Sequence, residues 1–277
     1  MQKHYRHHIE IHGKPDRDWL ILIHGAGGSS KSWYKQLAAF AEHFHVLVYD
    51  LRGHGKTAAL NEHDEEEYSF HLIAQDLLSI MDQHHIRSAH LCGCSLGTVV
   101  MQELSLIAPE RIDSMVMAGA VTKFHGWSKL LYMIARYLLV HILSKDQLYP
   151  LMAYMFMPFK LARGSRRLFI RESKKLCPDV FYKWWRLTYQ FTIYHRLKEM
   201  RIPTLIVMGE YDYSFLSGSY LLLKKCPNAT HHVLERAGHV CNMDQPRAFN
   251  KLAVEFLLGQ SGAKSVVREE EAFHLLA

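Results

Sequence analysis

The chain of 277 residues has little cysteine and no long apolar run. Its five cysteines are an odd number and lack the spacing of a disulfide framework, which indicates a reducing compartment and argues against structural disulfides. No apolar stretch reaches the roughly 20 residues that span a bilayer. The first residues also lack the apolar segment that is typical of a signal peptide. These absences predict a cytoplasmic protein.

Two kinds of ligand site lack their usual signatures. His4, His7, His8 and His12 lie close together in the sequence, but no second group of ligands accompanies them, so we expect no metal site. The glycine-rich stretch 24–28 could cradle a phosphate, but it lacks the Lys-Ser/Thr ending of a P-loop.

The positive charge is confined to one segment. The formal net charge is +6, but residues 121–200 hold 15 basic and 4 acidic residues, which gives +11. The remainder has 18 basic and 23 acidic residues, which gives −5. A local excess of this kind indicates an electrostatic feature of one insertion, so we expect no nucleic-acid partner.

Short apolar runs alternate with amphipathic stretches along most of the chain. Continuous apolar runs are typical of strands that are buried on both faces of a parallel sheet. The alternation therefore predicts an α/β fold, with a mostly parallel sheet and helices on both faces. We expect an edge strand at 5–11, further strands at 19–23, 45–49, 88–92, 112–118, 203–209 and 231–235, and helices at 32–43, 69–84, 98–104, 214–225 and 246–258.

The pattern changes after residue 120. Residues 121–200 lack strand-like runs and contain long helical stretches rich in Leu, Met, Tyr and Arg, which predicts a helical cap inserted into the sheet domain. The core then comprises residues 1–120 and 201–258. The polar composition of the tail, 259–277, is compatible with either disorder or a loosely docked helix.

The centre of the functional hypothesis is Gly93-Cys94-Ser95-Leu96-Gly97. G-x-S-x-G arises by chance in roughly one chain in ten of this length, so the pentapeptide alone is weak. Here it lies between a predicted strand and a predicted helix, the context of a nucleophile elbow. The glycines leave room for a strained turn that lifts the serine hydroxyl clear of the sheet.

A serine nucleophile needs a base, and a histidine base needs a group that orients it. His239 follows the last predicted strand, and Asp212 follows the strand before it. The chain order Ser, Asp, His is the one that the α/β-hydrolase fold uses. Glu210 competes with Asp212 for the place of the acid, and we favour Asp212.

These motifs together resemble the α/β-hydrolase superfamily in its cap-bearing branch, over about residues 19–258. The resemblance implies a triad of Ser95, Asp212 and His239. It also implies an oxyanion hole formed by the N–H groups of Ala26 and Leu96. A serine at the elbow excludes the branches that use an aspartate nucleophile.

The resemblance extends to the loops after the first strands, with two departures. We expect His24 to brace the oxyanion loop, and Arg52 and His54 to organise the loop Asp50-Leu51-Arg52-Gly53-His54-Gly55. The family usually begins with a β-hairpin, but only one strand fits before Trp19, so we expect a sheet of seven or eight strands. The proline that often follows the catalytic acid is absent.

The cap should determine the substrate. Its apolar residues would either line an acyl pocket or pack the cap together, and its basic residues would either face solvent or attract an anionic substrate or an anionic membrane surface. The apolar candidates are Leu130, Met133, Ile134, Tyr137, Met152, Met155 and Phe156, and the basic ones are Arg163, Arg166, Arg167, Arg171, Lys174 and Lys175.

The sequence thus predicts a serine hydrolase that cleaves a carboxylic ester, a lactone or a thioester of a small-molecule acyl substrate, without metal or organic cofactor. Two alternatives stay open. The first is a C–O lyase that uses the same triad on a carboxylated small molecule, as in the menaquinone pathway. The second is a binding protein with little turnover. The oligomeric state is left open.

Overall fold

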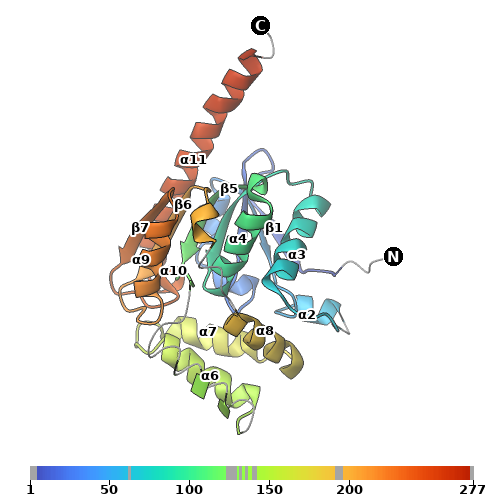
Figure 1. Ribbon diagram of the computed structural model, residues 1–277, viewed down its shortest axis with the longest axis vertical. Coiled ribbons are helices and arrows are strands. Elements are labelled where there is room, and N and C mark those ends of the chain that lie inside the picture. Colours follow the sequence, from blue (N-terminus) through green and yellow to red (C-terminus); the bar gives the residue numbers. More distant parts are fainter. Residues whose placement is uncertain are drawn as a thin grey trace.

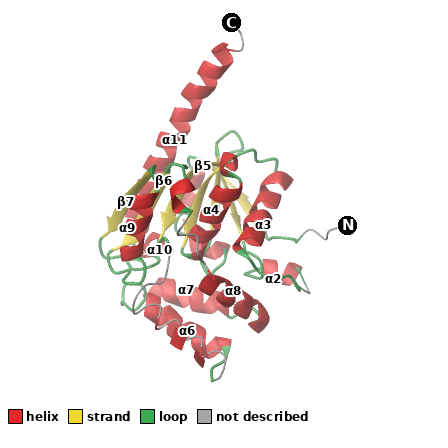
Figure 2. Ribbon diagram, in the orientation of Figure 1, coloured by secondary structure: helices red, strands yellow, loops and turns green. Residues whose placement is uncertain are grey.

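The computed structural model describes residues 5–61, 64–122, 130, 133–134, 137–138, 142–190 and 196–274, with the backbone alone for 189–190 and 262–274. Within these residues the centre of the molecule is a seven-stranded sheet with the strand order β1-β3-β2-β4-β5-β6-β7 (Figure 2). The strands are β1 (Ile9–His12), β2 (Trp19–Ile23), β3 (His45–Tyr49), β4 (Ala89–Cys94), β5 (Ile112–Ala118), β6 (Thr204–Gly209) and β7 (Ala229–Leu234).

The sheet is parallel except at one edge. β1 pairs antiparallel with β3, and the five remaining strand pairs are parallel. The predicted mostly parallel sheet is therefore confirmed, with the smaller of the two expected strand numbers. The single strand before Trp19 lies at the edge, where it covers the flank of β3.

Both faces of the sheet are buried, which explains the continuous apolar runs. Ile21 and Ile23 point to the face covered by α3 (Phe70–Gln83), α4 (Leu96–Ile107) and α9 (Leu216–Lys225). Leu20 and Leu22 point to the opposite face, covered by α1 (Leu37–Ala41) and α11 (Pro246–His274). Because side chains alternate along a strand, a strand covered on both sides is apolar at every position.

One helical prediction differs from the structure: the expected helix at 32–43 is divided into η1 (Ser30–Trp33) and α1, with a turn between them. The tail after Leu258, for which disorder and a helix were both left open, is helical to His274 and continues α11, whose C-terminal part projects away from the body of the molecule (Figure 1). The remaining helices are α2 (Thr57–Leu60), η2 (Pro109–Arg111), α6 (Lys145–Phe156), α7 (Arg163–Ser173), α8 (Pro178–Gln190), η4 (Leu197–Glu199) and α10 (Cys241–Asp244).

Helices α6, α7 and α8 lie together beside one end of the sheet (Figure 1). They contact the loops that follow β2 and β3: Tyr149 of α6 bonds to the carbonyl of Ala26, and Trp184 of α8 bonds to the carbonyl of Arg52. These helices therefore cover the carboxyl ends of the parallel strands, where α/β folds place their ligand sites.

Candidate active site

Ser95 lies at the turn between β4 and α4 with a positive φ of 52° and a ψ of −115°. A Cβ atom at Gly93 would lie 2.4 Å from the Met101 sulfur, and one at Gly97 would lie 2.3 Å from the carbonyl oxygen of Ile23. Only glycine fits at either position. The local geometry is that of the predicted elbow, in which a residue in a rarely populated conformation carries the serine hydroxyl.

His239 contacts both predicted partners. Its Nε2 lies 2.8 Å from Ser95 Oγ, and its Nδ1 lies 2.8 Å from Asp212 Oδ2. Asp212 is 1% exposed and His239 is 5% exposed, so the contact between them is buried, whereas the contact to Ser95 is part-buried and opens to the cavity. An imidazole that carries its proton on Nδ1 donates to Asp212 and accepts the hydroxyl proton of Ser95, as a general base must.

The competing acid, Glu210, serves a different contact. Its Oε2 accepts a hydrogen bond of 3.0 Å from the backbone N–H of Arg236, in the turn after β7. Asp212 lies three residues after the end of β6, and its other oxygen accepts a bond of 3.2 Å from the N–H of Phe215. The structure therefore brings Asp212, not Glu210, to the imidazole.

The two predicted oxyanion donors lie beside the serine. Leu96 is the first residue of α4, and the N–H groups of a first helical turn have no partner within their own helix. Ala26 lies in the loop after β2, which passes close to the elbow: a Cβ atom at Gly25 would lie 3.2 Å from the Cβ of Ser95. Ala26, Leu96, Ser95 and His239 all line one cavity.

Two buried histidines brace the loop that holds Ala26. His24 Nδ1 bonds to the carbonyl of Gly25 at 2.8 Å, and its Nε2 accepts from the N–H of Leu51 at 3.0 Å. His54 Nε2 accepts from the N–H of Gly27 at 3.0 Å. Burial lowers the pKa of both imidazoles, that of His54 to about 3, so both are neutral near pH 7. The contacts of His24 agree with the bracing role expected from the sequence, whereas His54, which was expected to organise its own loop, also reaches across to the loop that holds Ala26.

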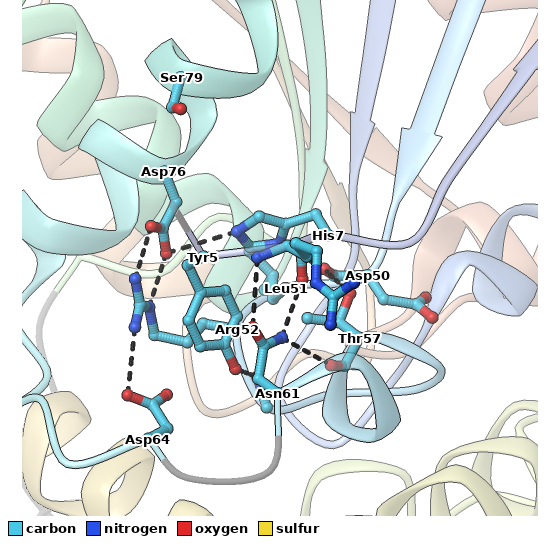
Figure 3. A network of polar contacts seen from close by, with 12 residues as sticks. Tyr5, His7, Asp50, Leu51, Arg52, Thr57, Asn61, Asp64, Asp76 and Ser79 are labelled. Atoms are coloured by element: carbon cyan, nitrogen blue, oxygen red, sulfur yellow. Dashed lines mark hydrogen bonds and ion pairs between the residues drawn. The ribbon is translucent and has the colours of Figure 1, made fainter. Parts of the chain in front are cut away.

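Arg52 is the centre of a polar network between α3, the N-terminal segment and α8 (Figure 3). Its Nε and Nη2 donate to the two oxygens of Asp76 at 2.8 and 2.7 Å, and its Nη1 donates to Asp64 at 3.2 Å. The guanidinium also stacks on the ring of Tyr5 at 3.7 Å. The arginine lies outside the cavity, in agreement with its expected role in organising the loop.

A cavity of about 140 Å³ lies between the elbow and the cap helices. Its lining is mostly apolar, and no Lys, Arg, Asp or Glu is among the lining residues that the structure describes. An apolar cavity of similar size, about 150 Å³, can hold benzene. The aromatic lining residues are Phe70, Tyr149, Phe156, Phe169, Phe181, Trp184, Trp185 and Phe215.

Most of the apolar cap residues that we considered as the lining of an acyl pocket lie outside this cavity. Of the seven candidates only Met152 and Phe156 line it. The side chains of Leu130, Met133, Ile134 and Tyr137 are between 46% and 61% exposed, and Met155 is half-buried outside the lining. The lining comes instead from α6, α7 and α8 and from the core beneath them. The other residues of the run 130–140 lie outside the described part of the chain.

The basic cap residues also lie outside the cavity. Five of the six are exposed on or after α7, as expected for a solvated face: Arg163, Arg167, Arg171, Lys174 and Lys175. Arg166 differs, because it is buried and donates to the carbonyls of Met157 and Phe159. Whether the exposed residues attract an anionic partner stays a prediction.

Two polar residues that no sequence motif marks also support the site. Asp244 accepts from the N–H of Gly238, next to the predicted base, at 3.0 Å, and from the hydroxyl of Ser165 on α7 at 2.7 Å. Tyr149 donates to the carbonyl of Ala26 at 2.8 Å. Both link the cap to the catalytic loops. Neither belongs to a motif, so only the fold reveals them.

The described residues contain no group of three or more His, Cys, Asp or Glu residues that could hold a metal ion. They also contain no helix whose length and apolar character would let it cross a membrane.

Known proteins match almost the whole chain. Residues 18–139 match a family model described as alpha/beta hydrolase fold. The chain is 28% identical over 260 residues to a Pseudomonas savastanoi pv. phaseolicola protein named "Putative carbamate hydrolase RutD", which covers 92% of this chain and 99% of that relative. It is 25% identical over 256 residues to 3-oxoadipate enol-lactonase 2 of Acinetobacter baylyi, which covers 89% and 90% of the two chains. The solved enol-lactonase from Burkholderia xenovorans LB400 has the same fold, with a TM-score of 0.79, 21% identity and coverage of 91% and 96%.

Proposed function

This chain belongs to the α/β-hydrolase superfamily, and on that premise we propose that it cleaves a carboxylic ester through an acyl-enzyme on Ser95. The observation that carries the proposal is the pair of 2.8 Å contacts from His239 to Ser95 and Asp212, beside an apolar cavity. That the chain is an enzyme of the α/β-hydrolase type follows from its family. The proposal concerns the bond that it cleaves and the residues that cleave it.

Acylation begins when Ser95 Oγ attacks the carbonyl carbon of the ester. His239 Nε2 takes the hydroxyl proton, and Asp212 stabilises the imidazolium that forms. General-base assistance of this kind typically gives about 10²- to 10⁴-fold. His239 then gives the proton to the departing alcohol, so that the alcohol leaves neutral and the acyl group stays on Ser95.

The negative charge of the tetrahedral intermediate develops on the former carbonyl oxygen. The N–H groups of Ala26 and Leu96 donate to that oxygen, and loss of one such donor typically costs about 10²- to 10³-fold in turnover. In the second half of the reaction a water molecule takes the place of the alcohol. His239 removes its proton as the water oxygen attacks the acyl carbon, and His239 then returns the proton to Ser95 Oγ as the carboxylic acid leaves.

The cavity supports a neutral, apolar group of modest size on the acyl side. Burying an ionised carboxylate against aromatic side chains without a cationic partner is costly, and the described lining offers none. The same feature weighs against the alternative of a lyase for a carboxylated molecule. The names of the relatives, an enol-lactonase and a carbamate hydrolase, leave lactones and related carbonyl compounds as substrates beside simple esters.

A series of p-nitrophenyl esters from acetate to laurate tests the proposal. We expect turnover by the wild type with an optimum at short acyl chains, because the cavity holds about 140 Å³. Ser95→Ala should lose on the order of 10⁴-fold or more in kcat. Ser105→Ala is the matched control, since Ser105 lies on α4 and its hydroxyl donates within that helix, to the carbonyl of Gln102.

The control should keep its activity. Esterase activity that survives in Ser95→Ala, or a wild type that is inactive across the whole series, would contradict the proposal.

A further inference from the structure

The loop that carries Ala26 has two successive peptide groups, and both are held by hydrogen bonds. The first joins Gly25 to Ala26. Its carbonyl accepts from the N–H of Gly28 at 3.0 Å and from His24 Nδ1 at 2.8 Å. Because a trans peptide is planar with its C=O and N–H in opposite directions, bonds to the carbonyl also fix the direction of the Ala26 N–H.

The second peptide group joins Ala26 to Gly27 and is held on both edges. Its carbonyl accepts from the Tyr149 hydroxyl at 2.8 Å, and its N–H donates to His54 Nε2 at 3.0 Å. His54 Nδ1 in turn bonds to the carbonyl of Arg52 at 3.0 Å, so the tautomer that accepts at Nε2 is set. Four residues thus hold the two peptide groups by hydrogen bonds. His24, Gly28 and His54 belong to the sheet domain, and Tyr149 comes from the cap.

Tyr149 is suited to act as a permanent donor. The residue is 9% exposed, and burial raises the pKa of its phenol, so the hydroxyl keeps its proton across the usual assay range. The ring lies directly on the loop: a Cβ atom at Gly27, whose φ is +71°, would lie 2.3 Å from the hydroxyl oxygen. Phe181 of α8 packs edge-on against the same ring at 6.3 Å between centroids.

A second bond ties the cap to the same network. Trp184 Nε1 donates to the carbonyl of Arg52 at 3.0 Å, the carbonyl that also orients His54. Two cap helices, α6 and α8, therefore reach the oxyanion loop by hydrogen bonds, one directly and one through His54.

We propose that Tyr149 is a positioning residue that holds the peptide group after Ala26 and so, through the Ala26 Cα, supports the alignment of the Ala26 N–H that the bonds to the Gly25 carbonyl begin, and that the oxyanion hole is fully aligned only when the cap is seated on the loop. The inference rests on the proposed function, in which Ala26 donates to the oxyanion. Tyr149 acts through the backbone and does not itself touch the reacting atoms. Misplacing a catalytic group by about 1 Å can cost on the order of 10²-fold in rate.

The test is Tyr149→Phe, which removes one hydroxyl and keeps the ring. We expect kcat on the best p-nitrophenyl ester to fall about 10- to 100-fold, with KM changed by less than about threefold, because the lost interaction matters only in the transition state. The inhibition constant of trifluoroacetophenone, whose adduct with Ser95 carries an oxyanion, should rise by the same factor as kcat/KM falls. The melting temperature should change little.

Tyr154→Phe is the matched control, because Tyr154 lies on the same helix but is 56% exposed and packs on Arg166. Its kcat and inhibition constant should equal those of the wild type. A Tyr149→Phe variant that keeps the wild-type kcat and inhibition constant, or that raises KM alone, overturns the inference.

Hydrogen exchange separates this inference from the proposed function. In Tyr149→Phe the amides of residues 24–28 should exchange faster than in the wild type and in Tyr154→Phe, whatever the substrate of the enzyme. If Ser95→Ala keeps esterase activity, the proposed function fails while this measurement still tests the contact. Unchanged exchange in Tyr149→Phe would refute the positioning role by itself.

Discussion

Replacing Asp76 by asparagine should destabilise the fold strongly, because it breaks a buried, bidentate ion pair. The guanidinium of Arg52 donates two bonds, of 2.8 and 2.7 Å, to the carboxylate (Figure 3). The side chains of Arg52 and Asp76 are 5% and 10% exposed. Asp64, at 3.2 Å from the guanidinium, would be the only carboxylate that still contacts Arg52 in the part of the chain that the structure describes.

The loss in free energy of unfolding on Asp76→Asn can be estimated from these contacts. Hydrogen bonds to charged groups contribute about 1.5–3 kcal/mol each, and removing one partner of a buried pair costs about 3–5 kcal/mol. Asp64 still compensates part of the arginine charge, so we expect a loss of about 3 kcal/mol. For a protein of this size that corresponds to a melting temperature lower by about 6–12 °C.

Thermal and urea unfolding of Asp76→Asn and Asp82→Asn measure this directly. Asp82 lies on the same helix and contacts Arg111 at the same distance of 2.7 Å, but it is 68% exposed. An exposed pair contributes about 1 kcal/mol at most. Equal losses in the two variants, or a loss below about 1 kcal/mol for Asp76→Asn, would refute the reasoning from burial.

The same pair gives a dependence on pH. Burial raises the pKa of Asp76, but the hydrogen bonds and charges of Arg52 and His7 together outweigh burial and hold that pKa below its usual range. A carboxylate with a lowered folded-state pKa stabilises the fold above its unfolded pKa, near 4, and this contribution is lost as the pH falls through the folded-state value. The difference in stability between wild type and Asp76→Asn should therefore shrink below about pH 4.

Three further predictions follow from the site. Asp212→Asn should lower kcat by about 10⁴-fold, whereas Glu210→Gln should leave it near the wild-type value, and comparison of their steady-state rates decides which acid serves the triad. The pKa of His54 is lowered to about 3 in the folded protein, so between pH 7 and pH 5 only the unfolded chain gains a proton at this histidine, and the free energy of unfolding should fall by about 2 kcal/mol. Urea titrations at the two pH values should show a smaller fall for His54→Asn than for the wild type. Gly97→Ala would place a methyl group 2.3 Å from the carbonyl of Ile23, so it should yield little folded protein; normal yield and activity would contradict the close packing of the elbow.

The pattern of apolar residues was enough to predict the sheet, because a strand that is buried on both faces is a continuous apolar run in the sequence. Residues 19–23, which are β2, are apolar throughout and pair with neighbours on both sides. Helix 32–43 was predicted as one unit because a short 3₁₀ turn and an α-helix expose nearly the same spacing of apolar residues. Its division at residues 34–36 depends on the cap from Ser29 and on packing against β3, which the pattern does not contain.

Motif order predicted which residues would meet at the site. Ser95, Asp212 and His239 each follow a strand of the parallel sheet, and the carboxyl ends of such strands share one edge. The topology therefore brings the three side chains into contact, although 144 residues separate the serine from the histidine.

The cavity could not be predicted in the same way. A helix that is apolar nearly all round indicates burial but does not show which face meets a substrate, so Leu130 and Met133 were wrong choices. The lining depends on how α6 and α8 dock, which brings Tyr149 and Trp184 over the loops. The prediction for Arg166 was wrong for a related reason. A charged side chain is expected to lie in solvent, but the guanidinium of Arg166 is buried and donates to the carbonyls of Met157 and Phe159.

The most direct test of the account is whether an acyl group forms on Ser95. The enzyme is mixed with a short p-nitrophenyl ester, quenched in acid within the first turnover, digested and mapped by mass spectrometry. The account predicts an added acyl mass on the peptide that contains Ser95 in the wild type, and none on that peptide in Ser95→Ala. Rapid hydrolysis without any acylated peptide, or an acyl group on another residue, would contradict it.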